Sequence, residues 1–198
     1  MEIKRINTCN KNIVERIVSI HLSVLNDSFL NNFGGKFLKV IYCNLIESRE
    51  TICLVLYENN KIEGFALAST DYSKFLSTAM KKDRFSILLS MMKGFILRPV
   101  VLYWLLKSIP KILFSKETPH SELQFLGVSP EFQGKGFGRA IMKRLDEEFK
   151  KQNISQFYVG TKARDPLSNM FYQKIRFTKE YSKTYFDDVL NYYLSPRE

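Results

Sequence analysis

Apolar and polar positions along the chain repeat with two different periods, and together they predict a fold that mixes strands and helices. A period of two is typical of strands, whose alternate side chains point to opposite faces of a sheet. The strands predicted in this way cover 2–6, 52–57, 62–68, 122–128, 156–160, 177–185 and 188–194. A period near 3.6 predicts helices over 12–25, 36–48, parts of 72–116, a stretch ending near 152, and 167–175. This order predicts the α/β class, with a mixed sheet of about seven strands flanked by helices.

Length and composition are those of one globular unit. The chain has 198 residues, of which 45% are hydrophobic and 25% charged, and its nine glycines and six prolines exclude a low-complexity chain. We therefore expect 1–198 to form a single domain that includes a helical insertion at 72–116.

The basic charge is concentrated in that insertion. Residues 72–116 contain nine Lys or Arg and one Asp, a charge of +8 out of the total of +10, so the remainder carries only +2. Phe85, Leu88, Leu89, Met92, Phe95 and Ile96 recur there at helical spacing. Three interpretations stay open: amphipathic helices that close over the sheet, a lid over an anionic acceptor, or peripheral contact with an acidic membrane surface.

Neither a membrane span nor a nucleic-acid surface is predicted. The most apolar stretch, 85–106, is interrupted by Lys93, Arg98 and Pro99, and its longest charge-free tail has eight residues, against roughly 18 for a span. The basic residues are interspersed with aliphatic side chains rather than with stacking platforms, which argues against nucleic-acid binding. The N-terminal residues alternate like a first strand and do not resemble a signal peptide.

The three cysteines show no metal-binding or redox spacing. Cys9, Cys43 and Cys53 are odd in number and form no Cys-x-x-Cys pair, and no histidine lies near them in a metal-binding spacing. The sequence therefore predicts three reduced thiols in a cytoplasmic protein, with Cys43 and Cys53 filling the core.

The stretch from 122 to 139 carries the most informative chemical signal. A strand that ends at Val128 leads into a loop with glycine at 134, 136 and 138, where an amphipathic helix begins. Glycines let the backbone approach a bulky ligand and direct successive N–H groups toward it, and a helix N-terminus adds partial positive charge. Lys135 and Arg139 add two full charges. The pattern predicts a cradle for a pyrophosphate.

Two common phosphate loops are excluded by their spacing. A P-loop requires Ser or Thr after Gly-Lys, but Gly136 follows Lys135. The dinucleotide fingerprint requires Gly-x-Gly-x-x-Gly, whereas the spacing here is Gly-x-Gly-x-Gly.

The glycine loop resembles the central motif of the GNAT superfamily of acyl-CoA-dependent N-acetyltransferases. That motif reads Gln or Arg, two residues, Gly, one residue, and Gly or Ala, and Gln133, Gly136 and Gly138 match it. The resemblance implies acetyl-CoA as cosubstrate, no metal, and a central strand that separates from the next one to admit the pantetheine. The coenzyme contacts that it implies are Leu126, Gly127, Val128, Gln133, Gly134, Lys135, Gly136, Phe137, Gly138 and Arg139.

A second family motif falls on 165–177. Tyr172 matches it, whereas Asp165 replaces Asn and Arg176 replaces Gly. The resemblance implies that Asp165 and Ser168 also contact the coenzyme. The replacement at 176 predicts an altered turn before the last strands.

Acetyl transfer to an amine requires a base, because an alkylamine with a pKa near 10.4 is almost fully protonated at pH 7. Glu122 and His120 are the two candidates, at the start of the central strand. A glutamate would need burial to raise its pKa, while a histidine starts near neutrality. The family motif implies that Tyr172 gives a proton to the leaving thiolate and that the Val128 N–H binds the thioester oxygen. No covalent enzyme intermediate is expected.

The sequence thus predicts an acetyl-CoA-dependent N-acetyltransferase that acts by direct transfer, as a monomer or homodimer. We expect the acceptor to be the primary amine of a small polar or anionic molecule, with an amino sugar as one candidate. Two alternatives stay open: acetylation of a protein N-terminus or lysine, and a non-catalytic acyl-CoA sensor.

Overall fold

Seven strands form one mixed sheet in the computed structural model, which describes residues 1–25, 28–79, 85, 87–89, 91–92, 120–185 and 188–197. The strands are β1 (Glu2–Ile6), β2 (Thr51–Glu58), β3 (Lys61–Ser69), β4 (Glu122–Val128), β5 (Tyr158–Lys162), β6 (Thr178–Tyr185) and β7 (Asp188–Leu194). Their order is β1-β2-β3-β4-β5-β7-β6, and every neighbouring pair is antiparallel except β4–β5. The predicted α/β class and the sheet of about seven strands are confirmed.

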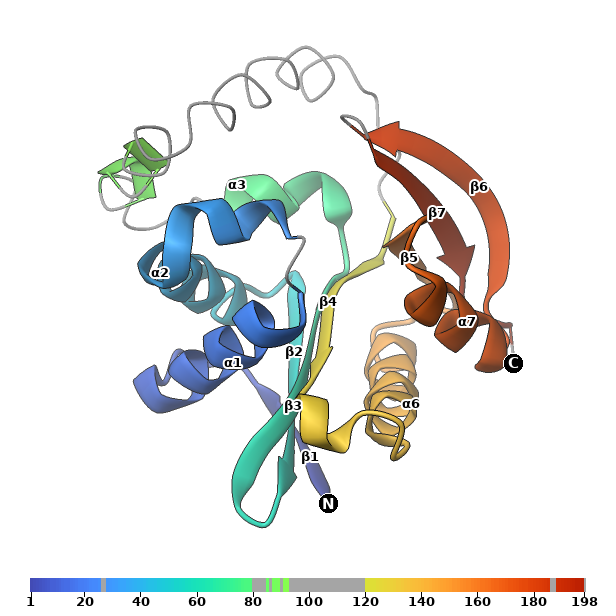
Figure 1. Ribbon diagram of the computed structural model, residues 1–198, viewed down its shortest axis with the longest axis horizontal. Coiled ribbons are helices and arrows are strands. Elements are labelled where there is room, and N and C mark those ends of the chain that lie inside the picture. Colours follow the sequence, from blue (N-terminus) through green and yellow to red (C-terminus); the bar gives the residue numbers. More distant parts are fainter. Residues whose placement is uncertain are drawn as a thin grey trace.

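Helices cover both faces of the sheet (Figure 1). On one face lie α1 (Lys11–Val24) and α2 (Gly34–Ile46), and on the other lie α6 (Phe137–Lys150) and α7 (Pro166–Lys174). The short α3 (Phe75–Ala79) and three 3₁₀ turns complete the described elements, at Phe29–Phe33, Tyr72–Lys74 and Pro130–Phe132.

Strand alternation divides the core into two clusters. Val55 and Phe65 pack with α1 and α2, while their neighbours Leu54 and Ala66 pack with α6. Because β2 and β3 are covered on both sides, they read as nearly continuous apolar runs.

The predicted insertion, 72–116, lies partly outside the described residues, which within it are 72–79, 85, 87–89, 91 and 92. Ile87 is buried and Met91 packs against the core. Of the stripe predicted from the spacing, Phe95 and Ile96 lie outside the described residues. The other four are exposed: Phe85 by 77%, Leu88 by 56%, Leu89 by 58% and Met92 by 51%. Of the three interpretations, the one in which this stripe closes over the sheet does not hold for these four residues, because the pair one helical turn apart, Ile87 and Met91, faces the core instead.

The cysteines also depart from the prediction. A disulfide joins Cys9, which follows β1, to Cys43 on α2, with their Cα atoms 5.0 Å apart. Cys53 is a buried free thiol whose pKa is raised to about 12 by burial. The expectation of three reduced thiols is wrong for Cys9 and Cys43, because folding brings together two positions 34 residues apart in the sequence.

The fold buries His21 completely. The ring lies on α1, and its Nδ1 is hydrogen bonded to the Tyr42 hydroxyl at 2.7 Å. The ring edge also packs against Phe125, with ring centroids 5.1 Å apart. Burial lowers the pKa of His21 to about 4.

We expect this histidine to make the protein acid-sensitive. In the unfolded chain His21 takes up a proton below about pH 6.5, whereas in the folded chain it stays unprotonated until the pH falls to about 4. The stabilisation is complete above pH 6.5 and is lost as the pH falls toward 4, by about 2 kcal/mol at pH 5. Urea unfolding at pH 7 and pH 5 measures this loss. A His21→Leu variant, which has no proton to bind, should lose less between the two pH values; an equal loss would contradict the assignment.

The turn after α7 keeps a glycine-like conformation without a glycine. Arg176 has a φ of 68°. The Phe177 N–H donates to the Tyr172 carbonyl and the Arg176 N–H donates to the Gln173 carbonyl, each at 3.0 Å. These two bonds form a Schellman motif, whose left-handed residue is usually glycine. The prediction of an altered turn is wrong, because arginine adopts the strained conformation itself.

Arg176→Gly should consequently stabilise the protein. Replacing the left-handed arginine by glycine is expected to raise the free energy of unfolding by about 0.5–1 kcal/mol, which corresponds to a rise in Tm of about 1–4 °C. Differential scanning fluorimetry without ligand measures the shift. Arg176→Ala is the matched control, because it removes the same charge but keeps a Cβ, and it should show no such gain. An equal rise in both variants would assign the effect to charge.

Candidate active site

The predicted glycine loop is open and shaped for close approach. Gly134 and Gly136 have φ values of 73° and 85°, and a Cβ at either position would meet no atom within 4 Å. Gly136 is the N-cap of α6 and offers no side chain to cap its first turn. The N–H groups of that turn therefore remain available to an anion, in the way that helix N-termini bind phosphates.

Side chains of the loop fix its course and add charge. The Gln133 side-chain amide donates to the Val128 carbonyl at 3.0 Å, which ties the loop back to the end of β4. The Lys135 ammonium lies 5.3 Å from the centre of the Phe132 ring. Arg139, in the first turn of α6, is exposed. Gly138 leaves room for Phe171 of α7, whose ring lies 3.3 Å from where a Cβ would be.

β4 separates from β5 soon after the two strands begin. They pair only at Glu122 with Tyr158 and at Leu123 with Val159. Gln124 is an extra residue in β4, because the β3–β4 register shifts between Phe125 and Leu123. Its Nε2 is buried and has no hydrogen-bond partner among the described residues. Such a bulge bends a strand and ends its pairing, and no periodicity in the sequence indicated it.

The separation exposes two backbone groups that the sequence analysis singled out. The Ser129 N–H donates to the Glu63 carbonyl at 2.8 Å. Hydrogen-bonded pairs alternate in an antiparallel ladder, so Gly127 also turns its backbone toward β3, whereas Leu126 and Val128 turn theirs toward the β5 side. At the level of Leu126 and Val128, β5 no longer pairs with β4 within the described ranges.

Gly127 itself is explained by packing. A Cβ there would lie 2.6 Å from Cε1 of Phe65 and 3.2 Å from Cγ2 of Ile20. The absence of a side chain thus lets β4 approach α1.

The two candidate bases form one hydrogen-bonded pair. His120 Nε2 and Glu122 Oε2 lie 2.8 Å apart, and Glu122 is buried. The His120 ring stacks on Tyr72, with centroids 5.2 Å apart, and meets Tyr158 edge-on at 5.4 Å. The sequence offered the two residues as alternatives, whereas the structure brings them together between aromatic rings, an arrangement that no sequence pattern indicated.

Tyr172, on α7, is buried in the hydrophobic core cluster that α6 and α7 cover. Its ring stacks with Tyr193 and packs against Phe177 and Phe171, and the hydroxyl makes no hydrogen bond within the described part of the chain. Burial, with a contribution from the nearby Asp165 carboxylate, raises the pKa of Tyr172 well above its ordinary value. The phenol therefore stays protonated at neutral pH and keeps a proton to donate.

Asp165 and Ser168 are engaged with each other. Asp165 is the N-cap of α7: it accepts the Ser168 N–H at 3.1 Å and the Ser168 hydroxyl at 2.5 Å. The neighbouring Asn169, which sequence reasoning missed, accepts from Asn191 and from the Tyr193 hydroxyl, both at 2.8 Å. These bonds anchor α7 to β7.

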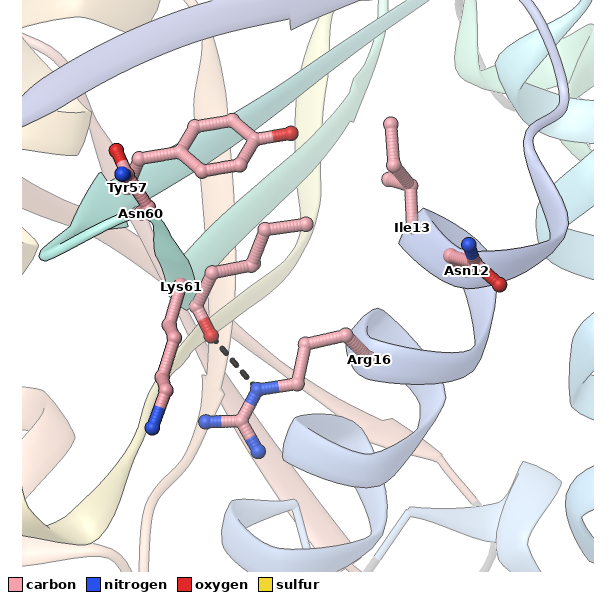
Figure 2. A pocket seen from close by; sticks show the side chains of 7 residues that line it. Asn12, Ile13, Arg16, Tyr57, Asn60 and Lys61 are labelled. Carbon is pink, nitrogen blue, oxygen red and sulfur yellow. Dashed lines mark hydrogen bonds between the residues drawn. The ribbon is translucent and has the colours of Figure 1, made fainter.

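A cavity of about 450 Å³ lies between α1 and the β2–β3 hairpin (Figure 2). Its lining consists of Asn12, Ile13, Arg16, Tyr57, Asn60, Lys61 and Ile62. None of the predicted site residues is among them.

Arg16, in the wall of that cavity, connects three parts of the fold. Its Nε donates to the Ile62 carbonyl at 2.7 Å, and its guanidinium pairs with the Glu63 carboxylate at 2.5 Å. That carboxylate also accepts the Ser129 hydroxyl at 2.7 Å. The cluster Arg16–Glu63–Ser129 thus joins α1, β3 and the residue that follows β4.

Two kinds of feature are absent from the described ranges. No helix there is long and apolar enough to cross a bilayer. The same ranges contain no group of three or more His, Cys, Asp or Glu side chains placed to hold a metal ion.

Comparison with known proteins identifies the fold. The family model described as acetyltransferase (GNAT) family matches residues 21–177. No curated protein sequence is significantly similar to the chain.

Solved structures share the fold at low sequence identity. A structure described only as an acetyltransferase has a TM-score of 0.64 at 15% identity, with 100% of each chain covered. The ribosomal-protein-S18-alanine N-acetyltransferase of Escherichia coli has 0.59 at 13%, covering 99% of this chain and 93% of that one. The PaiA N-acetyltransferase of Thermoplasma acidophilum, in complex with coenzyme A, has 0.58 at 12%, covering 97% and 98%.

Proposed function

The chain belongs to the GNAT family of acetyltransferases, and from this premise we propose that it moves the acetyl group of acetyl-CoA onto a primary amine of a small polar or anionic acceptor. One observation carries the proposal. β4 stops pairing with β5 after Leu123, and the stretch of β4 beyond that point runs from the His120–Glu122 pair at the start of the strand to the glycine loop that follows its end.

The residues fit the coenzyme. The open positions at Gly134 and Gly136 and the uncapped start of α6 suit a pyrophosphate. The backbone groups of Leu126 and Val128 suit an extended amide-containing arm, because they lie on the side of β4 that β5 has left. When bound, acetyl-CoA supplies an acetyl group activated as a thioester.

The His120–Glu122 pair is the base in this proposal. Glu122 is buried and holds one nitrogen of the imidazole, which orients the ring. The pair takes a proton from the acceptor ammonium, directly or through a water molecule, so that the amine attacks in its neutral form.

Backbone and phenol groups complete the site. A strand rises about 3.3 Å per residue, so the Leu126 N–H lies about 7 Å nearer to Glu122 than the Val128 N–H does. We therefore assign the thioester oxygen to the Leu126 N–H, in place of the Val128 N–H that the family motif implied, and assign Val128 to the coenzyme arm. Tyr172, kept protonated by burial, gives its proton to the departing thiolate.

Aromatic rings around the base support a small acceptor. The rings of Tyr72 and Tyr158 flank His120, and the ring centroids of Tyr181 and Tyr158 lie 6.1 Å apart. Tyrosine rings beside a carboxylate bind an organic ammonium through cation–π attraction and charge. The fold alone does not select the acceptor, because similar structures include an enzyme named for a ribosomal protein.

Thermal-shift measurement with acetyl-CoA, followed by a panel of amines read out as free thiol release, tests the proposal. We expect acetyl-CoA to raise the Tm and small amines to release thiol. A shift without thiol release from any small amine or peptide would identify an acyl-CoA sensor. A shift with unrelated nucleotides only would refute the proposal.

A further inference from the structure

Four apolar side chains are exposed together within the described part of the insertion, and we propose that they dock the protein on an anionic membrane surface. They are called the exposed stripe: Phe85, Leu88, Leu89 and Met92. Such docking is independent of the proposed function, because no residue of the exposed stripe is assigned to the coenzyme or to the base.

The exposed stripe follows one side of a helix. Residues 85, 87–89, 91 and 92 are helical, and positions three, four and seven residues after Phe85 lie on the same side as that residue. Ile87 and Met91, which are four residues apart, face the core on another side. The core thus covers one apolar side of this helix, while a second apolar side faces solvent.

This concentration of exposed apolar side chains is local. Ten large apolar side chains among the described residues are exposed, and four of them lie between positions 85 and 92. Each of these four is exposed by more than half, and Phe85 by 77%. Isolated exposed apolar residues are ordinary in a folded protein, whereas a contiguous group of them marks an interaction surface.

The sequence around the exposed stripe is basic, which indicates the kind of surface that it fits. Residues 81–93 contain four Lys or Arg and one Asp, a net charge of +3. Residues 84–116 contain six Lys or Arg and no Asp or Glu. Apolar side chains that enter the acyl region, accompanied by Lys and Arg that reach the headgroups, are typical of segments that bind anionic bilayer surfaces.

Charge argues against a second copy of the chain as the occupant. Two copies that met through the exposed stripe would bring together two segments that each carry +8 over residues 72–116, and like charges repel. Anionic lipids neutralise the same charge. Nucleic acid is also a poor match, because three of the four side chains are aliphatic and offer no ring on which a base could stack.

The exposed stripe belongs to the side of the sheet opposite to the glycine loop. Ile87 is part of the core cluster of α1 and α2, whereas α6, which begins at that loop, covers the other cluster (Figure 1). The preceding α3 is tied to α2, because the Asn44 side-chain amide donates to the Ala79 carbonyl at 2.8 Å. A docked protein would therefore keep its glycine loop accessible to a coenzyme in the water.

Cosedimentation of the full chain with lipid vesicles tests the docking. Vesicles of phosphatidylcholine mixed with phosphatidylglycerol should bind the protein at least about tenfold more tightly than vesicles of phosphatidylcholine alone. The difference should shrink as salt is added. Equal binding to both kinds of vesicle, or binding to neither, would overturn the proposal.

A double variant locates the contact. Leu88→Ser with Leu89→Ser should weaken binding to the anionic vesicles about tenfold or more, because two leucine side chains no longer leave water. Leu167→Ser with Met170→Ser is the matched control, since these residues of α7 are exposed by 79% and 49%, and it should keep wild-type binding. Wild-type binding by the Leu88 and Leu89 variant, or an equal loss in the control, would show that the exposed stripe is not the contact.

Sedimentation velocity without lipid tests the competing occupant. We expect the wild-type protein and the variant at Leu88 and Leu89 to sediment as the same species. A wild-type dimer that this variant dissociates would assign the exposed stripe to a second copy and overturn membrane docking. Thiol release from a soluble amine should be equal in the two proteins, so a failure of docking leaves the proposed function standing.

Discussion

Glu122→Gln should reduce kcat by roughly 10²–10⁴-fold with little change in the dissociation constant of acetyl-CoA. Glutamine keeps the shape of the side chain but can no longer accept a proton or attract one onto His120. Steady-state kinetics at saturating acetyl-CoA, with titration of the coenzyme in parallel, separates the two quantities.

Steady-state kinetics of His120 variants distinguish a hydrogen-bonded pair that acts as one catalytic unit from two groups that act independently. If both residues act as one unit, His120→Asn and the double variant should each lose about as much as Glu122→Gln, since effects within a catalytic unit are not additive. A Glu122→Gln enzyme that retains wild-type kcat would remove the base assignment. An unchanged Tm in each variant controls for misfolding.

Tyr172→Phe is expected to lower kcat by a similar factor, roughly 10²–10⁴, while the protein stays folded. Phenylalanine retains the ring that packs against Phe177 and Tyr193 and loses only the hydroxyl. Because burial raises the pKa of Tyr172, the wild-type rate should show no falling limb from its deprotonation up to about pH 10. Initial rates over pH 6–10 measure both effects.

Tyr57→Phe provides the matched control for the loss of a phenol, since Tyr57 lines the cavity beside α1 and is not assigned to the reaction. If Tyr172→Phe and Tyr57→Phe both keep the wild-type rate, the proton comes from another source. A large drop in Tm for Tyr172→Phe would instead reveal a structural hydroxyl, and would move the assignment from chemistry to packing.

Local patterns were sufficient to predict the strand that ends at Val128, the glycine loop and the helix behind it. Glycine spacing and periodicity are properties of short segments, and in this segment the structure agrees with the local conformational preferences of the residues. The mixed sheet followed from the order of elements for the same reason.

Contacts between distant residues were beyond that reasoning. The disulfide of Cys9 and Cys43 depends on how α2 lies against the end of β1. Among residues 85, 87–89, 91 and 92, it is Ile87 and Met91 that face the core, whereas the spacing pattern alone singled out the opposite side. The bulge at Gln124 has no signal of its own, because a single inserted residue leaves composition and period almost unchanged.

The cluster Arg16–Glu63–Ser129 has a practical consequence for engineering. Its hydrogen bonds connect α1, on one face of the sheet, to Ser129, the residue after β4 that leads into the glycine loop. Libraries that diversify α1 to broaden substrate scope should hold position 16 constant. A substitution at position 16 would remove the contact that holds the Glu63 carboxylate beside Ser129, so the start of the glycine loop would be less firmly positioned. Affinity for the coenzyme would then fall in variants selected only for new acceptors.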